Sequence, residues 1–286
     1  MRYEAPDSVD SAVALLAGAR GDARVLAGGT DLLVQMRADI LDPELIVDVK
    51  KIAETRAITE DKGTWRIGAA VTGAELREHA ALRRAWPGVV EAANLIGSTQ
   101  VQGRATMGGN LCNGSPAADS VPALIAAGAK AVMAGPNGRR ELAVEDVMLG
   151  PRKLALTKGE FLVSFLLPAR AKRSGDAYLR FIPRTEMDIA VVGAGVNLTV
   201  DGKGVITAAR VSLGAVAPRV LLVAPAAEAI VGSTLDQPAQ DRLEAAAQAA
   251  CQPIDDKRGT IEFRTQVAGV LARRTALIAL ARAKES

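Results

Sequence analysis

The chain has 286 residues, of which 49% are hydrophobic and 3% aromatic, with a formal net charge of +3. No apolar run approaches the ~20 residues of a membrane-spanning helix, and the opening Met1-Arg-Tyr-Glu-Ala-Pro6 lacks a signal segment, so we expect a cytoplasmic protein. Mixed charges without a basic block argue against nucleic-acid binding, while two cysteines and one histidine are too few for a zinc site or an iron–sulfur cluster.

The first part of the chain is predicted to form a small β-α-β unit. Its pattern indicates a capped helix over 9–18, a strand over 24–27, a helix from Thr30 and a strand over 45–49. The strand over 24–27 leads directly into Gly28 and Gly29, which predicts a tight turn before the second helix.

The middle of the chain is predicted to mix antiparallel strands with short helices. Thr72 and Glu75 have the spacing of a capping box, in which each side chain satisfies a free N–H at the start of a helix. The other predicted elements are a hairpin over 57–71, helices over 89–96 and 121–127, and strands over 130–134, 141–144 and 160–168.

The last third has a different pattern, after a linker predicted over 172–176. Alternating residues indicate three antiparallel strands over 178–182, 189–200 and 207–215, and helices follow over 240–251 and 263–280. The stretch Val192-Gly-Ala-Gly-Val-Asn197 imitates a Rossmann fingerprint, but the third glycine is missing and a hairpin turn follows in place of a helix. We interpret these glycines as allowing a strand to pack closely.

Two glycine-rich loops carry the functional signal. The first is Val25-Leu-Ala-Gly-Gly-Thr-Asp-Leu32, and the second, Arg104 to Asp119, contains Thr106-Met-Gly-Gly-Asn110. Successive N–H groups in such loops can point into one concavity and bind phosphate groups, whereas a lone Gly-Gly is more often only a turn. Two such loops can hold the diphosphate of a dinucleotide from both sides.

The two loops resemble those of the FAD-binding medium subunit of the molybdenum hydroxylases, the family of xanthine dehydrogenase and carbon monoxide dehydrogenase. In that family the first loop reads like Ala-Gly-Gly-Thr-Asp and the second like Thr-Ile-Gly-Gly-Asn, followed by Ser-Pro, here Ser115-Pro116, and an Asp, here Asp119. The segment from Asp256 to Arg264 is similar to the family's Arg-Gly-Ser-Ala-Glu-Tyr-Arg stretch. The resemblance covers nearly the whole chain.

The resemblance implies an α+β fold with two domains. A two-lobed, PCMH-type FAD-binding domain is expected over residues 1–172, with lobes of about 1–56 and 57–172. A C-terminal domain is expected over 177–286, built from a three-stranded antiparallel sheet and a helix bundle.

From the residues alone, N–H groups at both Gly-Gly pairs would hold the diphosphate, aided by the hydroxyls of Thr30 and Thr106 and the amide of Asn110. Neither loop carries a lysine, and neutral N–H, hydroxyl and amide donors would suffice to bind the diphosphate. The expected cofactor contacts in the two loops are Val25, Leu26, Ala27, Gly28, Gly29, Thr30, Asp31, Leu32, Thr106, Gly108, Gly109 and Asn110.

Further contacts are expected outside the loops. Asp119 either caps the following helix or contacts FAD, as the resemblance implies, and Ile96 either lies near the adenine or flavin ring or is plain core. By resemblance, Leu162 contacts FAD through its backbone, and Asp188 with Ile189 begins the strand near the isoalloxazine ring.

Arg180 stands where family members carry a cofactor-contacting Lys, and this departure keeps the charge but changes the geometry. Tyr178 and Arg184 are further candidates, equally suited to the domain interface.

None of these residues is a convincing general acid or base, so no catalytic residue and no metal ligand are predicted, and the flavin would carry the reactivity. The resemblance implies an oxidoreductase: an FAD-carrying electron-transfer subunit that takes electrons from 2Fe-2S clusters on a small partner chain. A large partner chain would hold the molybdenum-pterin cofactor and oxidise the substrate, and NAD, a quinone or oxygen would accept the electrons. The expected assembly is a dimer of heterotrimers, with docking beside residues 178–188.

Two alternatives stay open. One is a self-sufficient PCMH-type flavin oxidase or dehydrogenase with its own substrate pocket, although few residues follow the linker to build one. The other is a non-enzymatic scaffold whose Gly-Gly loops are simple turns.

Overall fold

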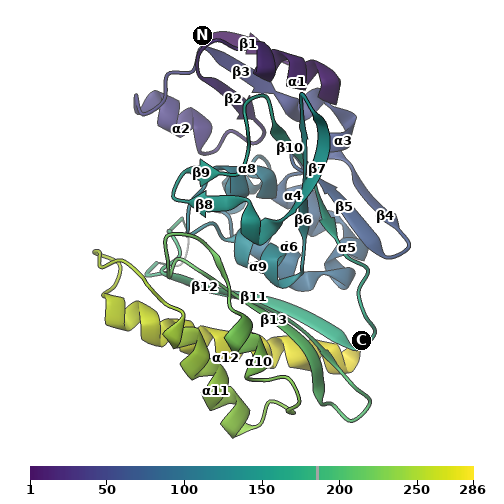
Figure 1. Ribbon diagram of the computed structural model, residues 1–286, viewed down its shortest axis with the longest axis vertical. Coiled ribbons are helices and arrows are strands. Elements are labelled where there is room, and N and C mark those ends of the chain that lie inside the picture. The colour runs from purple at the N-terminus through teal and green to yellow at the C-terminus, as the bar shows by residue number, and fades with distance from the viewer. Residues whose placement is uncertain (185–186) are drawn as a thin grey trace.

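The computed structural model describes residues 1–184 and 187–286. Figure 1 shows three layers along the long axis: a first lobe that carries the N-terminus at the top, a second lobe in the middle and the C-terminal elements at the bottom.

The first lobe contains the predicted β-α-β unit and one further strand. Its parallel sheet has the order β1-β3-β2. The strands are β1 (Arg2–Glu4), β2 (Ala23–Leu26) and β3 (Leu45–Asp48); the helices are α1 (Val9–Gly18), α2 (Leu32–Arg37) and α3 (Ala53–Arg56), with the 3-10 turn η1 (Val49–Lys51). Ser8 caps α1 by accepting from the N–H of Ser11 at 3.2 Å. The strand β1 has only three residues, too short for an alternating pattern to reveal it.

The second lobe is built on a five-stranded antiparallel sheet of order β4-β5-β10-β6-β7. The strands are β4 (Ile58–Asp61), β5 (Thr64–Gly68), β6 (Lys130–Gly135), β7 (Gly138–Ala143) and β10 (Phe161–Leu167). A second, two-stranded sheet pairs β8 (Met148–Gly150) with β9 (Lys153–Leu154) after the 3-10 turn η2 (Val144–Asp146).

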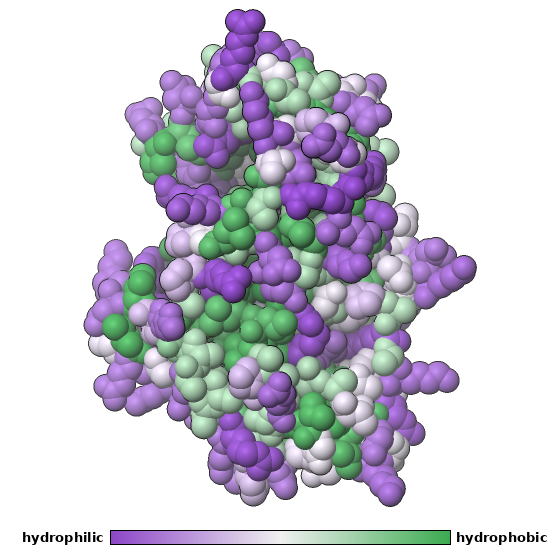
Figure 2. Space-filling view, in the orientation of Figure 1, coloured by the Kyte–Doolittle hydropathy of each residue, from purple (hydrophilic) through white to green (hydrophobic). Residues whose placement is uncertain are grey.

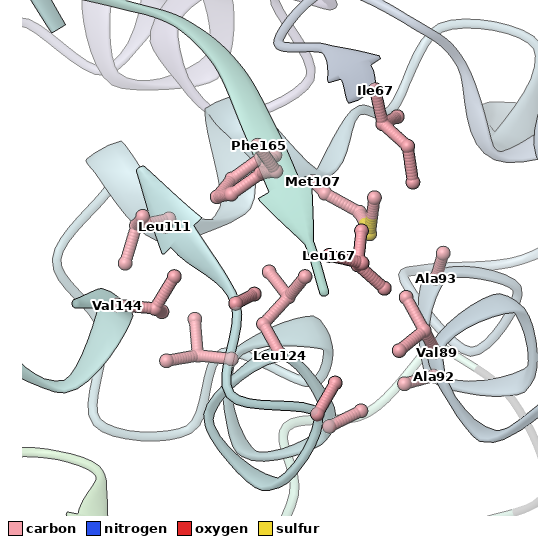
Figure 3. Packing of buried hydrophobic residues seen from close by; sticks show 14 of the residues in the cluster. Ile67, Val89, Ala92, Ala93, Met107, Leu111, Leu124, Val144, Phe165 and Leu167 are labelled. Carbon is pink, nitrogen blue, oxygen red and sulfur yellow. The ribbon is translucent and has the colours of Figure 1, made fainter. Parts of the chain in front are cut away.

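Short helices cover one face of this sheet, and the first lobe packs on the other face against Phe161 and Val163 of β10. The short helices are α4 (Gly73–Glu78), α5 (Ala80–Ala85), α6 (Pro87–Ala93), α7 (Thr99–Gln102), α8 (Met107–Cys112) and α9 (Ser120–Ala126). The predicted capping box at Thr72 and Glu75 is present at the start of α4. In Figure 3, Phe165 and Leu167 of β10 pack against Met107, Leu111 and Leu124. The core of this lobe therefore fixes α8, and with it the second glycine loop.

The C-terminal part is an antiparallel sheet of order β11-β12-β13-β14 covered by helices. The strands are β11 (Ser174–Phe181), β12 (Val192–Val200), β13 (Ile206–Gly214) and β14 (Leu221–Leu222), and the helices are α10 (Ala224–Glu228), α11 (Gln237–Ala249) and α12 (Ile261–Glu285). The three predicted strands are present, and the two-residue β14 adds a fourth. The predicted linker differs, because β11 already begins at Ser174, inside it.

Small residues set the spacing of these layers. A Cβ at Gly175 would lie 2.0 Å from the carbonyl oxygen of Ala279, so α12 packs directly on β11. A Cβ at Gly195 would lie 2.5 Å from the carbonyl oxygen of Pro122, so α9 packs on β12. The glycines of the Rossmann-like stretch thus serve close packing, as predicted.

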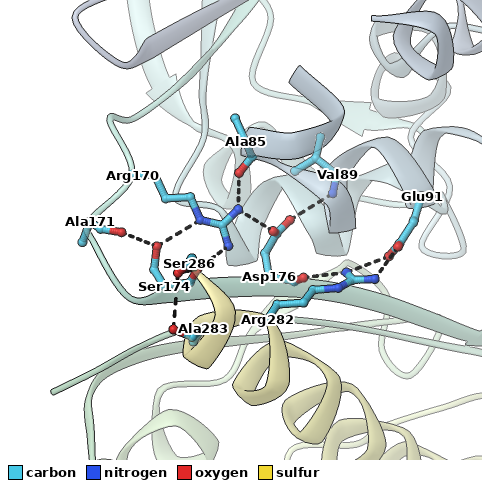
Figure 4. Close-up of polar contacts among 10 residues, drawn as sticks. All are labelled: Ala85, Val89, Glu91, Arg170, Ala171, Ser174, Asp176, Arg282, Ala283 and Ser286. Atoms are coloured by element: carbon cyan, nitrogen blue, oxygen red, sulfur yellow. Dashed lines mark hydrogen bonds and ion pairs between the residues drawn. The ribbon is translucent and has the colours of Figure 1, made fainter. Parts of the chain in front are cut away.

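Ionic side chains join the second lobe to the C-terminal sheet (Figure 4). The carboxylate of the buried Asp176 accepts from Nη1 of Arg170 at 2.8 Å and from the N–H of Val89 at 3.2 Å. Arg282 donates to the carbonyl oxygen of Asp176 at 2.8 Å and pairs with Glu91 of α6. Burial raises the pKa of Asp176, and Arg170 opposes that rise. The residues of this network are far apart in the sequence, and together they connect the second lobe to the C-terminal sheet.

Candidate functional site

A cavity of about 800 Å³ lies between the first and second lobes. This volume is in the range of about 300–1,000 Å³ that ligand and cofactor sites occupy. The predicted site residues that line it are Val25, Ala27, Gly28, Gly29, Thr30, Asp31, Leu32, Ile96, Thr106, Gly108, Gly109, Asn110 and Leu162. The fold therefore brings both glycine loops to one cavity.

The four glycines in these loops occur for different structural reasons. A Cβ at Gly28 would lie 2.0 Å from the carbonyl oxygen of Arg104, and one at Gly108 would lie 2.4 Å from that of Ala69, so both permit backbone to pack on backbone. Gly29 has a left-handed φ of +81°. A Cβ at Gly109 would meet only Oγ1 of Thr106, at 3.1 Å. Of the four, Gly109 is the one whose missing side chain leaves open space in the cavity wall.

The second loop is the start of a helix. Thr106 is the N-cap of α8, and its Oγ1 accepts from the N–H of Gly109 at 2.9 Å. Gly108 and Gly109 therefore have helical conformations, and their N–H groups belong to the first turn, where an α-helix has no backbone partners for its donors. Oγ1 of Thr106 is thus already used as the acceptor for the N–H of Gly109 in this turn.

Asn110 performs the capping that the sequence suggested for Asp119. Its Oδ1 accepts from both the N–H and the hydroxyl of Ser120, at 3.0 and 2.7 Å. The side chain of Asp119 makes no capping bond to α9. The expectation of a cap at Asp119 is therefore wrong, because the side chain of Asp119 turns toward the C-terminal sheet.

Asp119, Tyr178 and Arg180 form a buried cluster at that sheet, outside the cavity lining. Asp119 accepts from Nη1 of Arg180 at 2.7 Å and from the hydroxyl of Tyr178 at 3.1 Å. Burial raises the pKa of Asp119 to about 6, and Arg180 opposes this rise. Burial also raises the pKa of Tyr178 well above its usual value. The cluster ties the second loop to β11.

Three other predicted residues also lie outside the cavity lining. Leu26 is buried in the first lobe, with 7% of its surface exposed. Asp188 pairs with Arg184 at 3.1 Å and with Arg258 at 3.4 Å, and Ile189 is 53% exposed. The hydrogen bond from Nε of Arg184 is the main cause that lowers the pKa of Asp188 to about 2.

The structure adds cationic residues that the sequence did not indicate. Arg20, Arg152 and Lys158 line the cavity, and Arg152 has a left-handed φ of 58°. They come from three separate loops without any shared motif, so no local signal could have grouped them. Among the described residues these three form no ion pair, whereas Arg24 of the lining pairs with Asp22 at 2.9 Å. The cavity wall is thus suited to an anionic ligand.

The helix α2 borders the cavity without being buried. None of its residues is buried, and Leu33 and Val34 are 49% and 63% exposed. Figure 2 shows hydrophobic atoms over α2 at the upper left of the molecule. Asn113 links α8 to this helix, because it donates to Asp31 at 3.3 Å and accepts from Gln35 at 2.9 Å.

Residues 1–184 and 187–286 lack two further features, a cluster of metal ligands and a helix that could span a membrane. These ranges contain no group of three or more His, Cys, Asp or Glu side chains that could hold a metal ion. They also contain no helix that is both long and apolar enough to span a membrane.

Comparisons with known proteins place the chain in a family. Residues 1–170 match the FAD binding domain in molybdopterin dehydrogenase, and residues 177–279 match the CO dehydrogenase flavoprotein C-terminal domain. The chain belongs to this family of FAD-binding medium subunits of molybdenum hydroxylases, and the resemblance of its loops is confirmed.

Individual relatives are similar over their full length. The carbon monoxide dehydrogenase medium chain of Hydrogenophaga pseudoflava is 35% identical, with 98% of this chain and 97% of the relative covered. The xanthine dehydrogenase FAD-binding subunit of Escherichia coli O157:H7 is 31% identical, with 98% and 96% covered. A chain of the CO dehydrogenase from Oligotropha carboxidovorans superposes with a TM-score of 0.94 at 35% identity, covering 99% of this chain and 98% of that one. These relatives are dehydrogenase subunits, so the chain is an oxidoreductase subunit.

Proposed function

We propose that the cavity between the lobes holds FAD and that the chain is the electron-transfer subunit of a molybdenum-containing hydroxylase or dehydrogenase complex. The observation that carries the proposal is the meeting of two glycine loops at one cavity of about 800 Å³. The donors suit a dinucleotide, because the first turn of α8 and the loop at Gly28 and Gly29 supply N–H groups.

Different residues of the cavity would contact the diphosphate and the rings of FAD. N–H groups of Gly28, Gly29 and Gly108 would bind the diphosphate, whereas the N–H of Gly109 already donates to Oγ1 of Thr106. Arg20, Arg152 and Lys158 would attract the negative charge of the diphosphate. Ile96 would contact an apolar ring surface, and Leu162, whose side chain is buried in the core, would contact the cofactor through its backbone. Bound FAD supplies the step between one-electron and two-electron transfer.

Further contacts to the cofactor would come from the side of the C-terminal sheet, from Arg180, Asp119, Asp188 and Ile189. Because Arg180 is already paired with Asp119 at 2.7 Å, we propose that it reaches the cofactor only as part of this cluster. Leu26 would support the first loop from within the lobe.

The rest of the proposal concerns the assembly. Partner chains would carry 2Fe-2S clusters and the molybdenum-pterin cofactor, as a dimer of heterotrimers in the cytoplasm, with an external electron acceptor. The relatives support this, because one is named a medium chain and another an FAD-binding subunit. We further propose domains at 1–172 and 177–286, which agree with the matched ranges 1–170 and 177–279.

Purification of the chain tests the proposal. We expect a flavin absorption band, and yellow colour in the supernatant after acid precipitation, because a non-covalent cofactor is released. The purified chain should be reduced by dithionite but inert toward purines, aldehydes and carbon monoxide until iron–sulfur and molybdenum chains are added. Turnover by metal-free single chain would favour the self-sufficient flavoenzyme, and absence of flavin binding would favour the scaffold.

A further inference from the structure

Two cationic side chains hold the carbonyl groups of the first glycine loop. Nζ of Lys50 donates to the carbonyl oxygen of Ala27 at 3.0 Å. Nε of Arg104, from the second loop, donates to the carbonyl oxygen of Gly28 at 3.4 Å. Consecutive peptide groups of the loop are thus each fixed by a positive charge.

This arrangement determines where the adjoining N–H groups point. In a planar trans peptide the C=O and the following N–H point in opposite directions. Ala27, Gly28 and Gly29 line the cavity, whereas Lys50 and Arg104 do not. Holding the oxygens of Ala27 and Gly28 on the far side therefore turns the N–H groups of Gly28 and Gly29 toward the cavity.

Lys50 is itself held rigidly. Its Nζ lies 2.7 Å from both carboxylate oxygens of Asp48, which is 6% exposed. The hydroxyl of Tyr3 donates to Oδ2 of the same carboxylate at 2.7 Å. Burial alone would raise the pKa of Asp48, but hydrogen bonds from Lys50 and Tyr3 outweigh it, so the pKa is lowered. The carboxylate remains charged at neutral pH and keeps the ammonium group in place.

We infer that Lys50, supported by Arg104, is a positioning residue that orients the N–H donors of the first loop toward the diphosphate of the dinucleotide. The inference rests on the proposed function and adds a residue outside the cavity. Without this restraint the peptide groups could rotate, and a carbonyl oxygen facing the diphosphate would repel it.

The test compares Lys50→Met with Lys50→Arg and with the neighbouring Lys51→Met. Lys51 is exposed, so its replacement is a matched control. We expect Lys50→Met to weaken FAD binding about tenfold or more in fluorescence titrations of the apoprotein. Lys50→Arg should recover most of this loss, and Lys51→Met should bind as the wild type does.

A second readout separates orientation from general loss of structure. ADP carries a diphosphate and AMP does not, so the ratio of their affinities reports on the diphosphate contacts alone. We expect the ADP preference to fall in Lys50→Met but not in Lys51→Met. An unchanged FAD affinity and ADP preference in Lys50→Met would overturn the inference, as would an equal loss for ADP and AMP.

If Lys50→Met does not fold, Arg104→Met and Arg104→Lys decide the question by the same two readouts, with a smaller expected loss because the hydrogen bond is longer. Failure of the wild type to bind FAD would overturn the proposed function instead, while the ADP and AMP titrations would still test the orientation of the donors.

Discussion

Gly109 is the position where one added side chain should separate cofactor binding from folding. Its conformation is helical, and a Cβ there would meet only Oγ1 of Thr106, at 3.1 Å. Gly109→Val therefore places its methyl groups in the space that the proposed diphosphate would occupy. The backbone can accept the change, because no left-handed φ is required.

The two effects have different sizes. In a helix, Val is favoured over Gly by a few tenths of a kcal/mol, and disturbing the Thr106 cap costs about 1 kcal/mol, so the stability of the apoprotein should change by about 1 kcal/mol or less. Overpacking a filled site costs about 1–3 kcal/mol, which corresponds to about 5- to 150-fold in affinity. We expect FAD binding to weaken by that factor.

Fluorescence titration with FAD and thermal unfolding of the apoprotein measure the two quantities. Gly18→Val is the control, because Gly18 ends α1 on the surface and a Cβ there has no atom within 4 Å. It should retain full affinity. If Gly109→Val also retained full affinity, the first turn of α8 could not be the diphosphate site.

Three further substitutions test other parts of the structure. Arg170→Met leaves the buried Asp176 without its ion pair and should lower the free energy of unfolding in urea by about 3–5 kcal/mol. Hydrogen bonds from Arg140 lower the pKa of Glu160 to about 2 in the folded protein, from about 4.5 in the unfolded chain. The ion pair therefore stabilises the protein fully at pH values above about 4.5, and this contribution is lost as the pH falls toward 2. Arg140→Met should therefore cost about 1 kcal/mol at pH 7, after allowance for solvent screening, and little near pH 2. Cys112→Ala should keep FAD affinity, and because burial raises the pKa of Cys112 to about 12, its thiol should react slowly with iodoacetamide at pH 8.

The two arginine substitutions have controls, and each of the three substitutions has a contrary outcome. Lys172→Met and Lys130→Met replace exposed cations and should change stability by less than about 0.5 kcal/mol. If Arg170→Met lowered the free energy of unfolding no more than Lys172→Met does, the ion pair between Arg170 and Asp176 would not stabilise the fold. A pH-independent effect of Arg140→Met would contradict the ion pair with Glu160, and rapid alkylation of Cys112 in folded protein would show that the thiol is accessible.

Local patterns were enough to predict the capping box of α4 and the principal strands. The capping box at Thr72 and Glu75 and the strands around Asn197 follow from spacing alone. The fold class was also predicted, because the loop motifs are specific to one family. The strands β1, β8, β9 and β14 were missed, since each has only two or three residues, too few to show a periodicity.

Side-chain roles within the site were less predictable. The sequence left a helix cap and an FAD contact as alternatives for Asp119, but Asn110 reaches Ser120 and leaves Asp119 for Arg180, a residue 61 positions away. Which of two nearby polar side chains caps a helix depends on the distant partner that the other one finds. That partner becomes available only after the C-terminal sheet has packed on α9.

The two Gly-Gly turns after apolar segments follow from the order of the amino acids, because glycine is needed wherever backbone approaches backbone or φ is positive. Tertiary packing sets which contacts these glycines make: Gly28 makes room for Arg104 and Gly108 for Ala69, while Gly109 faces the cavity. It also determines that Lys50 orients the first loop and that Arg20, Arg152 and Lys158 surround one space. Charges and carbonyl groups act over a few ångströms in space, and chain order alone does not specify which of them become neighbours.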